Sequence, residues 1–83
     1  MEFPVAGNIT YSVILEPMEE GGFLVRVPVL PEVVTYGDTE DDAFAMAKDA
    51  IELVLASRIE RGETVPQEVA KARVRQLTVS IAA

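Results

Sequence analysis

The segment from Thr39 to Gly62 constrains the fold of this chain most, because its pattern predicts one long amphipathic helix. Thr39 is a favourable N-cap, and the acidic residues that follow it suit the positive end of a helix dipole. Gly62 and Pro66 end the pattern. The apolar positions recur at intervals of three and four: Ala43, Phe44, Ala47, Ala50, Ile51, Val54 and Leu55. A helix of about five to six turns with one apolar stripe needs a second layer to pack against.

Two strands joined by a hairpin are expected ahead of this helix. Residues 9–16 alternate between apolar and polar side chains, and residues 23–27 do the same. The acidic segment 17–22 between them is typical of a hairpin connection, in which Gly21 and Gly22 supply positive φ angles. The alternation indicates an antiparallel pair with one face buried.

Proline then interrupts the strand pattern and divides the sheet. Pro28 and Pro31 donate no ladder hydrogen bond, and residues 33–36 form a short third strand. After the helix, residues 67–83 are expected to form a polar linker and a final strand, in which Leu77, Val79 and Ile81 share one face. The predicted fold class is α+β. It is a β-β-β-α-β two-layer domain, with a three-stranded antiparallel sheet covered by one long helix plus a C-terminal strand.

The whole chain, residues 1–83, is expected to be a single domain with its core in residues 9–66 and no DNA-binding domain. A chain of 83 residues buries only about 60–65% of its unfolded surface, so we expect its stability to be marginal unless it self-associates. Its hydrophobic fraction of 49% is high for so small a domain. We therefore expect a homo-oligomer, either a dimer or a tetramer.

The composition excludes the commonest kinds of catalytic site and metal site. The chain contains no histidine and no cysteine, so it lacks the usual general base, a Ser–His triad and a cysteine metal site. We predict no catalytic residue, no metal and no cofactor. The net charge of −7 disfavours direct nucleic-acid binding and favours encounter with a basic protein. No signal peptide or membrane span is visible, which predicts a cytoplasmic protein.

Two charged clusters have simpler explanations than a reaction. Asp38 and residues 40–42 are acidic, and helix capping and the helix dipole account for them. Lys71, Arg73 and Arg75 form a basic cluster that could touch phosphate, although a solvated linker surface is the commoner outcome.

Residues 11–66 resemble the HicB family of antitoxins, also described as HicB-like or UPF0150 domains. The resemblance lies in the order and spacing of short motifs. These are Gly21-Gly22-Phe23 after an acidic loop, Val27-Pro28, Leu30-Pro31, Val34-Thr35-Tyr36-Gly37-Asp38-Thr39 leading into an acidic, alanine-rich helix, and Arg61-Gly62-Glu63-Thr64-Val65-Pro66.

The resemblance implies a partial RNase H-like fold that lacks the nuclease carboxylates. It also implies an antitoxin that binds and neutralises HicA, a small basic RNA-cleaving toxin, through protein–protein contact, often as an oligomer. The first hairpin combines acidity with an exposed position. We therefore expect the partner-binding residues there: Glu16, Glu19, Glu20, Phe23 and Arg26.

Two other functions are weighed beside this one. An orphan HicB-like oligomeric module would bind another protein or a small ligand and have no toxin partner. A vestigial RNase H-like nuclease would use Glu16 and helix acids with magnesium, and the composition favours it least.

Overall fold

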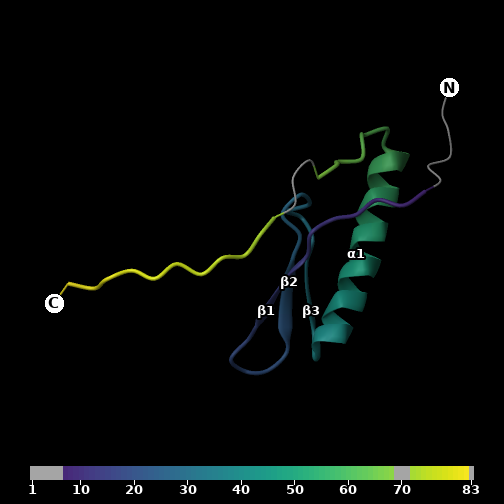
Figure 1. The fold of residues 1–83 in the computed structure, drawn as a ribbon. Coiled ribbons are helices and arrows are strands. Elements are labelled where there is room, and N and C mark those ends of the chain that lie inside the picture. The colour runs from purple at the N-terminus through teal and green to yellow at the C-terminus, as the bar shows by residue number, and fades with distance from the viewer. Residues whose placement is uncertain (1–6, 69–71, 83) are drawn as a thin grey trace.

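The computed structural model describes residues 7–68 and 72–82. Three strands, β1 (Ile14–Pro17), β2 (Phe23–Arg26) and β3 (Val34–Gly37), form an antiparallel sheet in the order β1-β2-β3. One helix, α1 (Glu40–Glu60), runs along one face of this sheet (Figure 1). The predicted α+β fold, with a three-stranded antiparallel sheet covered by one long helix, is confirmed.

The ladder register decides which side chains face α1. Leu15, Val25 and Thr35 lie in one row across the sheet, and Val25 is fully buried beneath the helix. Their neighbours in each strand point to the opposite face, because side chains alternate along a strand. The sheet therefore has one face covered by α1 and one open face.

The first strand is shorter than the sequence pattern predicts. Residues 9–13 continue the alternation, yet the ladder with β2 begins only at Ile14. The reason is that β2 ends at Arg26, after which the backbone turns and the N–H of Leu30 donates to the carbonyl oxygen of Val27. Pro28 follows this end, so the break predicted from proline is confirmed, and residues 9–13 have no strand of this sheet beside them.

Two small clusters make the core. Val25 packs with Ala43 and Ala47 of α1, while Val27, Leu30 and Val33 form a second cluster under the C-terminal half of the helix. The alanines let α1 approach the sheet closely. At Gly37 the helix lies so close to β3 that no side chain would fit, because a Cβ there would lie 2.2 Å from the backbone nitrogen of Ala43.

Both predicted ends of the helix are confirmed. Thr39 is the N-cap, and its Oγ1 accepts a hydrogen bond of 3.0 Å from the backbone N–H of Asp42. At the other end Gly62 takes a positive φ of 78°. The predicted apolar stripe is too wide by one residue, because Phe44 is 57% exposed rather than packed on the sheet.

The predicted C-terminal strand is not confirmed. Residues 72–82 belong to no ladder, and their large apolar side chains are exposed (Figure 1). A strand needs a neighbouring strand to receive its hydrogen bonds, and no edge of this sheet lies beside these residues. Lys71 and the N-terminal residues 1–6 lie outside the described residues. Within the described ranges, the helix is not long and apolar enough to cross a membrane.

Candidate functional site

The turn between β1 and β2 holds two exposed acidic residues in a fixed position. The N–H of Met18 donates to the carbonyl oxygen of Gly22, and the N–H of Gly21 donates to that of Met18, both at 3.0 Å. Gly21 and Gly22 have φ angles of 104° and 83°, as their sequence positions predicted. Glu19 and Glu20 project from this turn into solvent.

Tyr36 joins this turn to the connection between β3 and α1. Its hydroxyl lies 3.3 Å from the carbonyl oxygen of Gly21 and 3.3 Å from Oδ1 of Asp38. Desolvation of the hydroxyl, followed by the nearby carboxylates of Asp38 and Glu20, raises the pKa of Tyr36. Gly22 is required for this contact, because a Cβ there would lie 2.2 Å from the Tyr36 oxygen.

Carboxylates from both segments consequently gather at one end of the domain, which we call the acidic end. Its members are Glu19, Glu20, Asp38, Glu40, Asp41 and Asp42. The nearest cations along the chain are engaged elsewhere, since Arg26 pairs with Glu16 at 2.8 Å and Lys48 with Glu52 at 2.9 Å. Among the described residues no ion pair neutralises the acidic end, so it presents a field of one sign to an approaching partner.

The open face of the sheet adjoins the acidic end. Its residues are Ile14, Glu16, Leu24, Arg26, Val34 and Tyr36. Val34 and Tyr36 expose 55% and 43% of their surface, and the Glu16–Arg26 ion pair crosses between β1 and β2. Apolar side chains around one surface ion pair, beside a charged rim, suit contact with another protein.

The structure distributes the predicted partner-binding residues over both faces. Glu16 and Arg26 meet on the open face, and Glu19 and Glu20 occupy the adjacent turn. Phe23 lies on the opposite face of β2, where it is half-buried against the Val25 cluster. Their role in binding a partner stays a prediction, and Phe23 contributes to the core in addition.

Tyr36 and Asp38 were missed as members of this site. The sequence marks Tyr36 as a strand residue and Asp38 as part of a helix start, and both interpretations hold. Only the pairing of β2 with β3 sets Tyr36 beside the glycine turn. In the described part of the chain, no group of three acidic side chains is placed to hold a metal ion.

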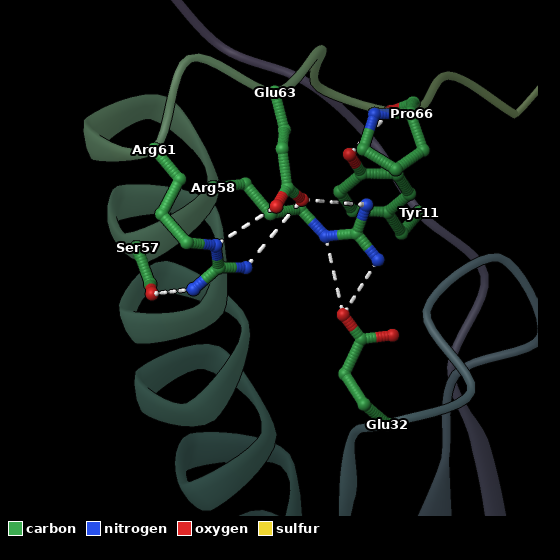
Figure 2. Close-up of polar contacts among 7 residues, drawn as sticks. All are labelled: Tyr11, Glu32, Ser57, Arg58, Arg61, Glu63 and Pro66. Atoms are coloured by element: carbon green, nitrogen blue, oxygen red, sulfur yellow. Dashed lines mark hydrogen bonds and ion pairs between the residues drawn. The ribbon is translucent and has the colours of Figure 1, made fainter.

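The opposite end of α1 also carries many charges, but there they are paired (Figure 2). Arg58 donates from Nη2 and Nε to one oxygen of Glu32, at 2.6 and 3.1 Å, and Arg61 pairs with Glu63 at 2.8 Å. We call these four residues the ion-paired end. The hydrogen bonds from Arg58 and Arg61 lower the pKa values of Glu32 and Glu63 respectively.

Beside the ion-paired end, Tyr11 connects the segment before β1 to the segment after α1. Its hydroxyl donates to the carbonyl oxygen of Pro66 (Figure 2). Desolvation raises the pKa of Tyr11, against the opposing charge of Arg58. Further along, the N–H of Ser12 donates to Glu68 at 2.7 Å, so the segment after α1 runs next to residues 11 and 12.

Comparison with known proteins places residues 11–78 within the model of a family described as the HicB_like antitoxin of bacterial toxin–antitoxin systems. The protein named Antitoxin HicB 1 of Photorhabdus laumondii is 44% identical over 59 residues, which cover 71% of this chain and 38% of that protein. Antitoxin HicB of Escherichia coli K12 is 38% identical over 56 residues, covering 68% of this chain and 41% of that protein.

A shorter relative extends the match to nearly its whole length. A UPF0150 protein of Thermoplasma acidophilum is 34% identical over 61 residues, covering 74% of this chain and 88% of the relative. The match therefore spans less than half the length of the two proteins named antitoxin, but most of the UPF0150 protein.

Proposed function

The chain belongs to the HicB-like antitoxin family, and from this premise we propose that it is an antitoxin that binds a small, basic, RNA-cleaving toxin of the HicA type. In this proposal the chain acts by covering the toxin's surface and not by catalysis. Its relatives named antitoxin support the role, and the chemistry of the described residues supports the mode of contact.

The observation that carries the proposal is the acidic end. A protein that cleaves RNA needs cationic side chains to hold the phosphate backbone. The carboxylates of the β1–β2 turn and of the β3–α1 connection lie side by side and form no ion pair within the described residues. Such a surface attracts a cationic patch and competes with RNA for it.

The open face supplies the contacts that charge alone does not. Complementary charges raise the rate of encounter more than they raise affinity, which comes mainly from well-packed apolar and aromatic groups. Val34 and Tyr36 are large and exposed on this face, and Tyr36 adjoins the acidic end. A toxin seated across this boundary would meet apolar surface on one side and carboxylates on the other.

The test is to purify the chain together with a small, basic toxin of the HicA type and to assay RNA cleavage. We expect a stable complex in which cleavage is suppressed, with an affinity that falls as salt is raised. Free toxin that cleaves RNA equally well in the presence of excess chain, with no complex, would overturn the antitoxin proposal.

The position of the contact is tested by charge reversal. The double variant Glu19→Lys/Glu20→Lys should weaken toxin binding at least about tenfold and reduce its salt dependence. The matched control is Asp49→Lys/Glu60→Lys, which makes the same change in net charge on exposed helix positions. Equal losses in both variants would show that only net charge matters and would remove the acidic end from the interface.

A further inference from the structure

β3 is an edge strand, because the sheet order is β1-β2-β3 and β2 lies on only one side of it. The ladder fixes which backbone groups point outward. Pro17 has no N–H, so the Pro17–Phe23 pair of β1 and β2 is not a hydrogen-bonded pair. Pairs alternate along an antiparallel ladder, so the N–H and C=O groups of Leu24 and Arg26 point towards β1. Those of Phe23 and Val25 point towards β3.

The backbone groups of β3 that face outward are consequently those of Val34 and Tyr36. Their partners across the ladder are Arg26 and Leu24, and these two residues bond to β1 instead. Two N–H groups and two carbonyl oxygens are left on the outer edge of β3, and within the described residues no hydrogen bond engages them. An edge with several free backbone groups is the template on which a further strand adds.

The helix lies along β3 more than along the other two strands (Figure 1). Near the start of α1, Ala43 is in close contact with Gly37, and further along Val54 packs against the cluster that contains Val33. α1 therefore runs back beside the whole of β3. A strand added to the outer edge of β3 would lie next to α1 as well, and its side chains on that face would need apolar neighbours.

Met46 and Leu53 supply those neighbours. Phe44 and Lys48, on one side of α1, line a groove beside residues 9–13, which lead into β1. The 3.6-residue repeat of a helix puts Met46 and Leu53 on the other side of α1, which faces away from β1. Met46 is 48% exposed and Leu53 is 72% exposed, so α1 carries free apolar surface beside the outer edge of β3.

We propose that the outer edge of β3 receives an extended segment of the partner protein as a further strand. The segment belongs to the basic toxin of the proposed function, on which this inference rests. Its backbone bonds to the N–H and C=O groups of Val34 and Tyr36. On one face of the sheet its apolar side chains contact Met46 and Leu53, and on the other face its side chains extend the open face.

Charge favours a basic partner over a second copy of this chain at this edge. Asp38 follows β3 directly, and no ion pair neutralises it among the described residues. If two β3 edges paired around a two-fold axis, with Val34 of one copy opposite Tyr36 of the other, Asp38 would approach Glu32 of the other copy. A Lys or Arg side chain of a basic segment meets the Asp38 carboxylate with the opposite charge.

Backbone hydrogen exchange tests the strand addition directly. It is measured by NMR on the chain alone and on its complex with the HicA-type toxin used in the antitoxin test. We expect the amides of Val34 and Tyr36 to exchange freely in the chain alone and at least about tenfold more slowly in the complex. The matched control is the amide of Leu15, which points outward from the opposite edge of the sheet and should exchange alike in both states.

The outcomes separate this contact from the antitoxin function. A complex in which the amides of Val34 and Tyr36 stay unprotected would overturn the strand addition and leave the antitoxin proposal standing. Slow exchange of these amides in the chain alone, if it increases with protein concentration, would show that a second copy occupies the edge and would also overturn the strand addition. Failure to form any complex would overturn both proposals.

Two substitutions on α1 test the side-chain contact. Met46→Asp should weaken binding of the toxin at least about tenfold, because it puts a carboxylate against apolar side chains of the added strand. Phe44→Asp is the matched control. It adds the same charge at a similarly exposed residue on the other side of α1, and it should change binding less than about twofold. Equal losses from the two variants would contradict a strand that lies against Met46.

Discussion

The two ends of α1 use charge in opposite ways. At the ion-paired end, Arg58 and Arg61 satisfy Glu32 and Glu63, and the nearby Tyr11 hydroxyl is bonded to the backbone. At the acidic end, carboxylates from two connections lie together and form no ion pair among the described residues. The charges of the ion-paired end are neutralised within the molecule, whereas those of the acidic end are available to a partner.

The difference reflects which segments of the chain have to be connected at each end of α1. The ion-paired end joins the turn at Glu32 to the end of α1, and beside it Tyr11 is bonded to the backbone at Pro66. Leu30 is fully buried in the same region. The acidic end instead consists of two tight connections, which backbone hydrogen bonds, glycine and the Thr39 cap already define. We therefore expect substitutions near the ion-paired end to act on stability first.

The largest effect expected is that of Leu30→Ala. Removing this fully buried side chain should lower the free energy of unfolding by about 2–5 kcal/mol, because it loses apolar burial and leaves a cavity. Urea unfolding measures the change. Leu53→Ala is the control, since Leu53 is 72% exposed and its truncation should cost less than about 0.5 kcal/mol. Similar losses for both would mean that the Val27–Leu30–Val33 cluster does not organise this region.

A smaller effect tests the turn at the acidic end. Gly22→Ala and Gly21→Ala both place a side chain at positive φ, which costs about 1–2 kcal/mol. Only Gly22→Ala also collides with Tyr36, so it should be the more destabilising of the two in urea unfolding. It should also weaken the proposed contact with a toxin by displacing Tyr36. If the two variants are equally stable, Tyr36 does not hold the turn.

The smallest effect expected is a dependence of stability on pH. The pKa values of Glu32 and Glu63 are lowered in the folded state from an ordinary value of 4.5, mainly by hydrogen bonds from Arg58 and Arg61. A lowered folded pKa stabilises the protein above that ordinary value, and the gain is lost as pH falls through the folded pKa. Glu32→Gln should therefore flatten the loss of stability in thermal unfolding between neutral pH and acid.

The control for the pH experiment is Glu19→Gln. Among the described residues Glu19 forms no ion pair, so its substitution should leave the acid side of the stability profile unchanged. If Glu19→Gln flattens the pH profile of stability as much as Glu32→Gln does, the two ends do not differ in how their carboxylates contribute to stability.

Local sequence patterns predicted the helix, its caps and the glycine turn because each depends on neighbouring residues. Thr39 binds an N–H three residues away, and Gly21 and Gly22 adopt angles that other residues avoid. The alternation of residues 9–13 and 77–81 is equally clear, yet neither segment forms a ladder here. Alternation shows that a segment has two unlike faces, but only a neighbouring edge makes it a strand.

The amino-acid sequence by itself determined the α+β class, the long capped helix, the acidic character of the first hairpin and the family of this chain. Tertiary structure alone decided that Tyr36 lies beside Gly21 and that Arg58 neutralises Glu32. The physical reason is the range of the interactions. Caps and turns are closed by residues a few positions apart, whereas these contacts depend on strand register and on where α1 rests across the sheet.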